Sequence, residues 1–151
     1  MKLKDLVGSG DKLGLFTLPF IVIGIGLNII FPKFFSVGGP PFFLQIISVI
    51  ILIPGVVIWL WSVYLILTVV PKKKLITYGP YVLVKHPLYV GVALLVIPWV
   101  GFLCNSWIGV VIGGALYIAS RMYAPEEEKL LAKAFGGFWE EYEAKVLMPW
   151  L

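Results

Sequence analysis

The stretch FFLQIISVIILIPGVVIWLWSVYLILTVV, residues 42 to 70, decides the fold class, because it holds no Asp, Glu, Lys or Arg over its whole length. As a straight α-helix it would extend about 43 Å, whereas the hydrocarbon core of a bilayer is about 30 Å thick. Pro54 and Gly55 near its middle are expected to kink it. Tilting absorbs part of the excess length, and the remainder should project beyond the membrane, beside the loop that follows.

Three further apolar segments, about 13–31, 88–103 and 107–122, lie before and after this stretch. With 60% hydrophobic and only 13% charged residues, the composition is far outside the soluble range. The sequence therefore predicts one all-α integral membrane domain over 1–151, with about four transmembrane helices. The last two, joined by the tight turn at 104–106, should form a short hairpin that either crosses the bilayer or dips into it.

The basic residues indicate how these spans are oriented. All but one lie before the first span, between the second and third, or after the fourth: Lys2, Lys4, Lys12, Lys72, Lys73, Lys74, Lys85, Arg121, Lys129, Lys133 and Lys145. Only Lys33 falls on the other side. Because cytosolic loops carry an excess of Lys and Arg, both termini and the central loop should be cytosolic. The membrane would be the cell membrane in a prokaryote and the endoplasmic reticulum in a eukaryote.

The placement of charge also excludes several function classes. No predicted span has an ionisable residue in its core, which weighs against a small ion-coupled transporter. One cysteine excludes an internal disulfide and a cysteine-built metal site, and no metal is expected. The net charge of +4 follows from membrane topology, so it does not indicate nucleic-acid binding. Any chemistry should therefore take place at the cytosolic surface of the bilayer.

One motif, YGPYVLVKHPLYVG at residues 78 to 91, places the only histidine at the start of the third span. Pro87 suits the first turn of a helix, so His86 should lie near outward-pointing backbone N–H groups that favour anions. His86 is either a structural cap or a functional group. The neighbouring Tyr89 and Gly91 favour a functional role, because glycine permits close backbone approach to a ligand.

A second polar segment, PEEEKLLAKAFGGFWEEYEAKV, covers residues 125 to 146. Pro125 suits the first position of a helix, and the glutamates after it complement the positive end of the helix dipole. An apolar stripe at helical spacing predicts a cytosolic amphipathic helix lying on the membrane or on the bundle. The same acids should face the surface that carries His86, where they could hold a cation or bind ribose hydroxyls. The residues alone leave both interpretations open.

Taken together, the two segments resemble the isoprenylcysteine carboxyl methyltransferases and their phospholipid methyltransferase relatives. The pattern of that family reads roughly G-P-Y-x-x-x-R-H-P-x-Y-x-G, followed by E-E-x-x-L-x-x-x-F-G-x-x-Y-x-x-Y-x-x-R-V. The match covers 78–146, with the expected hairpin between its halves. The resemblance implies S-adenosylmethionine as cofactor, held between the regions 78–91 and 121–146. The residues implied to bind it are Tyr81, His86, Pro87, Tyr89, Gly91, Glu127, Glu128 and Tyr142.

The resemblance also implies a lipophilic methyl acceptor that reaches the site from the membrane, sideways between the third and fourth spans. We expect Lys85 and Arg121 to bind the charge of the acceptor. A carboxylate, as in a prenylated cysteine, is already ionised at neutral pH, whereas an amine must first lose a proton, a task for His86 or Tyr89. Since methyl transfer from a sulfonium is an in-line displacement, the protein chiefly supplies orientation and exclusion of water.

The chain departs from the family pattern at three positions, with Lys85 and Lys145 in place of arginines and Trp139 in place of a tyrosine. Lysine keeps the charge but loses the planar fork that binds a carboxylate through two hydrogen bonds. The carboxylate acceptor is favoured over three alternatives. These are a phospholipid or amine N-methyltransferase, an NADPH-dependent membrane reductase of the sterol type, and a non-catalytic membrane scaffold.

Overall fold

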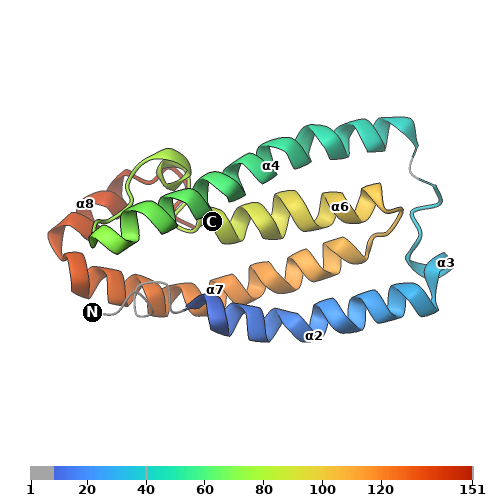
Figure 1. The fold of residues 1–151 in the computed structure, drawn as a ribbon, viewed down its shortest axis with the longest axis horizontal. Coiled ribbons are helices and arrows are strands. Elements are labelled where there is room, and N and C mark those ends of the chain that lie inside the picture. The colour runs from blue at the N-terminus through green and yellow to red at the C-terminus, as the bar shows by residue number, and fades with distance from the viewer. Residues whose placement is uncertain (1–8, 40, 151) are drawn as a thin grey trace.

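Four long helical segments lie side by side in the computed structural model, which describes residues 9–39 and 41–150 (Figure 1). They are α2 (Ser9–Ile30), α4 (Phe42–Val69), the run from α5 (Pro87–Val90) through η3 (Gly91–Val96) to α6 (Ile97–Leu103), and α7 (Ile108–Phe135). α2 packs on α7, α7 on α6, and α6 with η3 on α4. The helix bounds agree with the predicted first three spans.

Short elements close the two ends of this layer. One end, the α3 end, carries α3 (Pro32–Phe35) and the turn between α6 and α7 (Figure 1). The opposite end, the α8 end, carries η1 (Val70–Lys72), η2 (Gly79–Val82) and α8 (Gly137–Lys145). The central loop and the C-terminal segment therefore lie at the same end, as a four-span arrangement requires. Lys2 and Lys4, two of the basic residues from which the orientation is predicted, lie outside the described residues.

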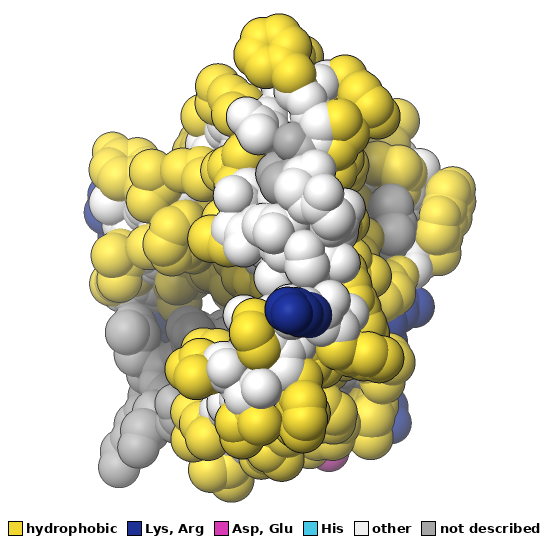
Figure 2. All heavy atoms as spheres, turned by 90° about the vertical axis from the view of Figure 1, so that its right-hand side faces the viewer, with side chains coloured by type: hydrophobic (Ala, Val, Ile, Leu, Met, Phe, Trp, Pro, Cys, Tyr) yellow, Lys and Arg dark blue, Asp and Glu magenta, His cyan; other side chains and the backbone are white. Residues whose placement is uncertain are grey.

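Three helices are long and apolar enough to cross a membrane, and a shorter apolar helix accompanies them: Lys12–Ile30, Phe42–Lys72, Ile108–Phe135 and, shorter, Pro87–Leu103. Large hydrophobic side chains face outward along the long helices, among them Leu15, Phe42 and Leu67. Figure 2, a view onto the α3 end, shows hydrophobic side chains around most of the perimeter. These features confirm the predicted all-α integral membrane fold.

The fourth segment differs from the prediction, because α7 does not end near residue 122 but continues through Pro125 to Phe135. The expectation that a new helix begins at Pro125 is therefore wrong. A proline inside a helix removes one hydrogen bond and costs about 3 kcal/mol. Here the helix is held on both sides, since Ala124 is buried and Glu126 pairs with Lys12 of α2. With 28 residues, α7 extends about 42 Å, so its charged turns after Arg121 project beyond the hydrocarbon core.

The predicted single helix over 125–146 is also wrong, because the chain breaks at Gly136. Gly136 adopts φ +54° and ψ −128°, a backbone conformation that a residue with a Cβ rarely reaches. The break turns α8 back toward the central loop, where Trp139 and Tyr142 are buried against Leu75 and Tyr81. This fold-back positions the second polar segment beside the first.

The helices of the hairpin approach each other backbone to backbone. A Cβ built on Gly113 would lie 2.3 Å from the carbonyl oxygen of Ala93, and one on Gly109 would lie 2.6 Å from that of Ile97. Such an approach leaves no gap between the third and fourth helices along these residues. The sideways route predicted for the acceptor between them is therefore closed along this stretch.

Gly113→Ala should destabilise the protein, because the new methyl group would collide with backbone that cannot move aside. Overpacking of this kind costs about 1–3 kcal/mol. The matched control is Gly114→Ala in the same helix, where an added Cβ meets nothing within 4 Å. Thermal unfolding in detergent should show a lower midpoint for Gly113→Ala and an unchanged or higher one for Gly114→Ala. Equal midpoints would contradict the backbone contact.

Hydrogen bonds between the two connections hold the α3 end together. Ser106 Oγ donates to Asn28 Oδ1 at 2.6 Å, and Asn105 Nδ2 donates to Ser36 Oγ at 3.0 Å. Cys104 is exposed in the turn at this end. These hydrogen bonds therefore connect the segments of the α3 end, and the thiol of Cys104 can be used to determine on which side of the membrane this end lies.

Cys104 should react with an impermeant maleimide added outside intact cells, because the lysine distribution predicts that the α3 end is extracytosolic. The readout is the mass shift of the purified protein, with Cys104→Ser as the unlabelled control. Labelling only after the reagent is admitted to the cytosol would reverse the predicted orientation.

Candidate functional site

A pocket opens at the α8 end, between the loop after α4, the start of α5, the end of α7, and α8. The empty space among its lining side chains, counted out to the solvent at its mouth, is about 690 Å³. Six of the residues singled out from the sequence line it together: Tyr81, Lys85, His86, Tyr89, Glu127 and Tyr142. The fold thus brings both sequence motifs to one cavity.

The other predicted site residues do not line this pocket. Pro87 is fully buried at the start of α5, and Gly91 packs against Ile58 of α4. Glu128 contacts the pocket residues Lys85 and His86. Arg121 is exposed on α7. Pro87 and Gly91 are packed inside the protein, and their predicted contact with the cofactor, like the predicted binding of acceptor charge by Arg121, stays a prediction.

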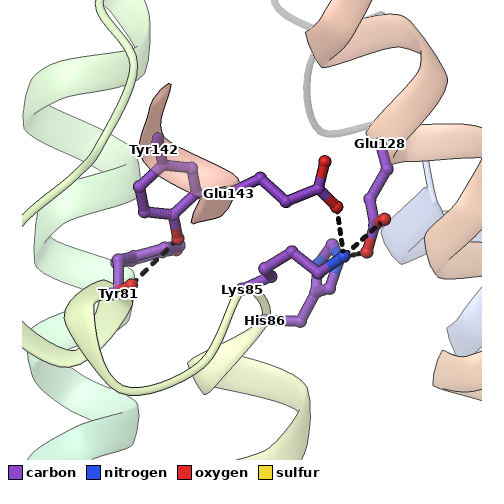
Figure 3. A network of polar contacts seen from close by, with 6 residues as sticks. All are labelled: Tyr81, Lys85, His86, Glu128, Tyr142 and Glu143. Atoms are coloured by element: carbon purple, nitrogen blue, oxygen red, sulfur yellow. Dashed lines mark hydrogen bonds and ion pairs between the residues drawn. The ribbon is translucent and has the colours of Figure 1, made fainter. Parts of the chain in front are cut away.

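A network of charged side chains joins the loop to α7 and α8 (Figure 3). Lys85 Nζ donates to Glu128 Oε2 at 2.7 Å and to Glu143 Oε1 at 3.0 Å. His86 Nε2 lies 3.2 Å from Glu128 Oε1. The Lys85 side chain is only 8% exposed, so its ammonium group is shielded between the two carboxylates.

The electrostatics of this network favour the charged forms. Burial opposes the charge of Lys85, but the hydrogen bonds to Glu128 and Glu143 outweigh it and raise the pKa of the ammonium group. Burial likewise opposes ionisation of Glu128, which lies on α7 beyond the hydrocarbon core, yet hydrogen bonds from His86 and Lys85 lower the pKa of its carboxyl. The pair is therefore ionised at neutral pH. Lys85 links three segments, and its predicted binding of acceptor charge stays a prediction.

Two tyrosines and the chain after α8 complete the enclosure. The Tyr142 hydroxyl donates to the carbonyl oxygen of Tyr81 at 2.9 Å, and burial raises the pKa of both phenols, so they stay protonated at neutral pH. The N–H groups of Leu147 and Met148 donate to the carbonyl oxygens of Val82 and Leu83 at 3.1 and 2.9 Å. α8 is thus tied to the central loop through side chains and main chain.

The pocket is lined mostly by apolar and aromatic side chains, and Lys74, Lys85, His86 and Glu127 are among its polar groups. The Glu127 carboxylate can accept hydrogen bonds from hydroxyl groups. Tyr81, Tyr89 and Trp139 offer aromatic faces, on which a planar base stacks and a cation is attracted. Within residues 9–39 and 41–150, no group of three or more His, Cys, Asp or Glu side chains is placed to hold a metal ion.

Glu143 and Lys74 were not assigned to the site from the sequence, and Trp139 was named there only as a departure from the family pattern. Trp139 and Tyr142 are three residues apart in α8 and so share one helix face, a spacing that could have identified the aromatic wall. Glu143 is one of several acids in this segment, and its pairing with Lys85 depends on how α8 folds back. Nothing in the sequence marks it out from its neighbours.

Comparison with protein families gives one match. The model of the isoprenylcysteine carboxyl methyltransferase (ICMT) family matches residues 40–133, which include α4, the central loop, the hairpin and most of α7. Comparison with curated proteins and with solved structures found no match. Because the matched residues make up more than half of the chain and carry three of the four long helical segments and much of the pocket, the protein belongs to the ICMT family of membrane methyltransferases.

Proposed function

We propose that the protein transfers a methyl group from S-adenosylmethionine to a carboxylate on a lipophilic acceptor, such as a prenylated cysteine. One observation carries this proposal. The pocket combines polar groups of the α8 end with an apolar wall from the bundle, formed by Ile66 and Val70 at the end of the α4 region and by Leu88 of α5. A water-soluble donor and a membrane-borne acceptor can meet only at such a boundary.

The donor is supported by the chemistry of the lining residues. When bound, S-adenosylmethionine supplies an electrophilic methyl group on a positively charged sulfur. Glu127 would hold ribose hydroxyls, and the aromatic faces of Tyr81, Tyr89 and Trp139 would hold the adenine ring and the cationic centre. α8, tied to the central loop through Tyr142, covers the pocket and excludes water from the donor side.

The acceptor is supported by the position of the pocket beside α4. Leu67, one turn from Val70, is 67% exposed on the lipid-facing surface of α4, so an apolar chain could reach the pocket past the end of that helix. An acceptor carboxylate is already ionised at neutral pH and needs no base. The protein therefore has to orient it, with Lys74 supplying positive charge at the pocket, since Lys85 is already paired with Glu128 and Glu143.

The product distinguishes a carboxyl acceptor from an amine. Purified protein is incubated with methyl-tritiated S-adenosylmethionine and N-acetyl-farnesylcysteine, with N-acetylcysteine as the control that lacks the lipid. The expected product is a methyl ester, which releases volatile tritiated methanol in alkali. An alkali-stable product, or label transferred instead to an amine headgroup, would overturn the carboxylate proposal.

The pH dependence of the methyl-transfer rate tests the same proposal independently. With saturating donor, a carboxylate acceptor should give a nearly constant rate from about pH 6 to 8, because the acceptor is already ionised over this whole range. His86→Gln serves as the control for titration of the histidine itself. A roughly tenfold rise per pH unit that persists in His86→Gln would indicate an amine acceptor.

A further inference from the structure

A second hollow adjoins the pocket and shares a wall with it. Lys74, Leu75, Phe135 and Tyr142 line both spaces. The empty space of the second hollow, including its wide opening to solvent, is about 1070 Å³. Neither sequence motif predicted a ligand for this region, and the proposed methyl transfer does not use it.

The charge of the second hollow is predominantly positive. Lys73 and Thr77 contribute from the loop, and Phe138, Glu141 and Lys145 contribute from α8. Lys145 Nζ donates to Glu141 Oε1 at 2.6 Å, and both side chains are largely exposed. With Lys74, three ammonium groups stand against one carboxylate among the described lining residues. The hollow therefore favours an anion.

The hollow lies close to the depth at which lipid headgroups begin. Leu67 of α4 is 67% exposed on the lipid-facing surface, and Lys73 follows directly after the end of α4 and the 3-10 turn η1. The headgroup region extends about 5–8 Å beyond the hydrocarbon core on each side. Phe138, 77% exposed on α8, adds a large aromatic ring beside the lysines. Phenylalanine on the apolar face of a surface helix inserts at the boundary between headgroups and acyl chains.

We propose that the second hollow binds the headgroup of an anionic phospholipid from the surrounding bilayer. Its phosphate would accept hydrogen bonds from Lys73, Lys145 and Thr77, while Phe138 contacts the adjoining glycerol and upper acyl chain. A lipid suits this surface better than free phosphate, because an exposed aromatic ring, that of Phe138, lines the hollow together with the lysines. The shared wall would let the bound lipid support the loop that also lines the pocket.

The test measures lipid retention and needs no methyl transfer, so it can fail independently of the proposed function. Protein purified in detergent is mixed with equal amounts of phosphatidylglycerol and phosphatidylcholine of identical chains, and bound lipid is counted by native mass spectrometry. The wild type should retain phosphatidylglycerol severalfold better. Lys73→Gln with Lys145→Gln should abolish that preference, because each lysine near an anionic headgroup adds to its binding. Lys74 is left intact because it also lines the pocket.

Two matched variants separate a headgroup site from a general loss of charge or fold. Lys33→Gln removes a lysine from α3 at the opposite end and should leave the preference unchanged. Glu141→Gln removes the carboxylate from the lining and should raise retention of phosphatidylglycerol, a gain that misfolding would not produce. Equal retention of the two lipids, no effect of the double lysine change, or displacement of the lipid by millimolar inorganic phosphate would each overturn the proposal.

Discussion

Lys85→Glu is expected to abolish methyl transfer and to lower the thermal midpoint, because it places three carboxylates where the structure holds an ammonium group between two. The Lys85 side chain is 8% exposed and the Glu128 side chain 22%, so water screens this repulsion poorly. Losing one partner of a buried ion pair costs about 3–5 kcal/mol. Glu143 is 44% exposed and can turn toward water, so most of the penalty falls on Glu128.

The matched control is Lys85→Arg, which keeps the charge and should retain most of the activity. Both variants are compared with the wild type by thermal unfolding in detergent and by the tritium-transfer assay. A Lys85→Glu protein that unfolds at the wild-type temperature and still transfers methyl groups would show that the link from the loop to α7 and α8 is dispensable.

Gly136→Ala should weaken donor binding more than tenfold while leaving the helical bundle folded. Alanine at φ +54° and ψ −128° is strained by about 1–3 kcal/mol, so α8 would no longer fold back in the same orientation. Trp139 and Tyr142 would then leave the wall of the pocket, whereas the long helices pack without α8.

Gly137→Ala provides the control, since an added Cβ meets nothing within 4 Å at either glycine and only Gly136 has a positive φ. Binding is measured by calorimetry, and folding by the thermal midpoint. Equal binding by the two alanine variants would mean that the backbone of Gly136 does not set the position of α8.

The helical bundle was predictable because hydropathy and lysine placement are patterns of long segments, in which one exceptional residue changes the pattern little. The continuation of α7 was not, because proline at 125 and the acids after it match a helix start as well as a helix interior. What decides between them is tertiary, namely the burial of Ala124 against the rest of the bundle. The π-helix of η3 over Gly91–Val96 lies just before Pro98, which indicates a perturbed helix there but not its type.

The site was predictable at the level of motifs but not of individual acids. Successive residues on a helix point about 100° apart, so Glu127 and Glu128 have different neighbours at the pocket. Glu127 lines it, and Glu128 pairs with His86 and Lys85. The rotation of α7 about its axis decides which of the two acids lines the pocket. Contacts two or more turns earlier in the helix, such as that of Gly113 with Ala93, fix this rotation. The sequence of the motif does not contain this information.

The central claim is that this pocket binds S-adenosylmethionine, and calorimetric titration of the purified protein tests it most directly. The wild type should bind S-adenosylmethionine and its demethylated product, S-adenosylhomocysteine. Glu127→Gln should weaken binding at least tenfold at an unchanged thermal midpoint, because a charged hydrogen bond to a ligand hydroxyl contributes about 1.5–3 kcal/mol. Glu126→Gln, a neighbouring acid that pairs with Lys12 outside the pocket, should bind like the wild type. Tight binding of NADPH with none of S-adenosylmethionine, or equal binding by Glu127→Gln and the wild type, would contradict the claim.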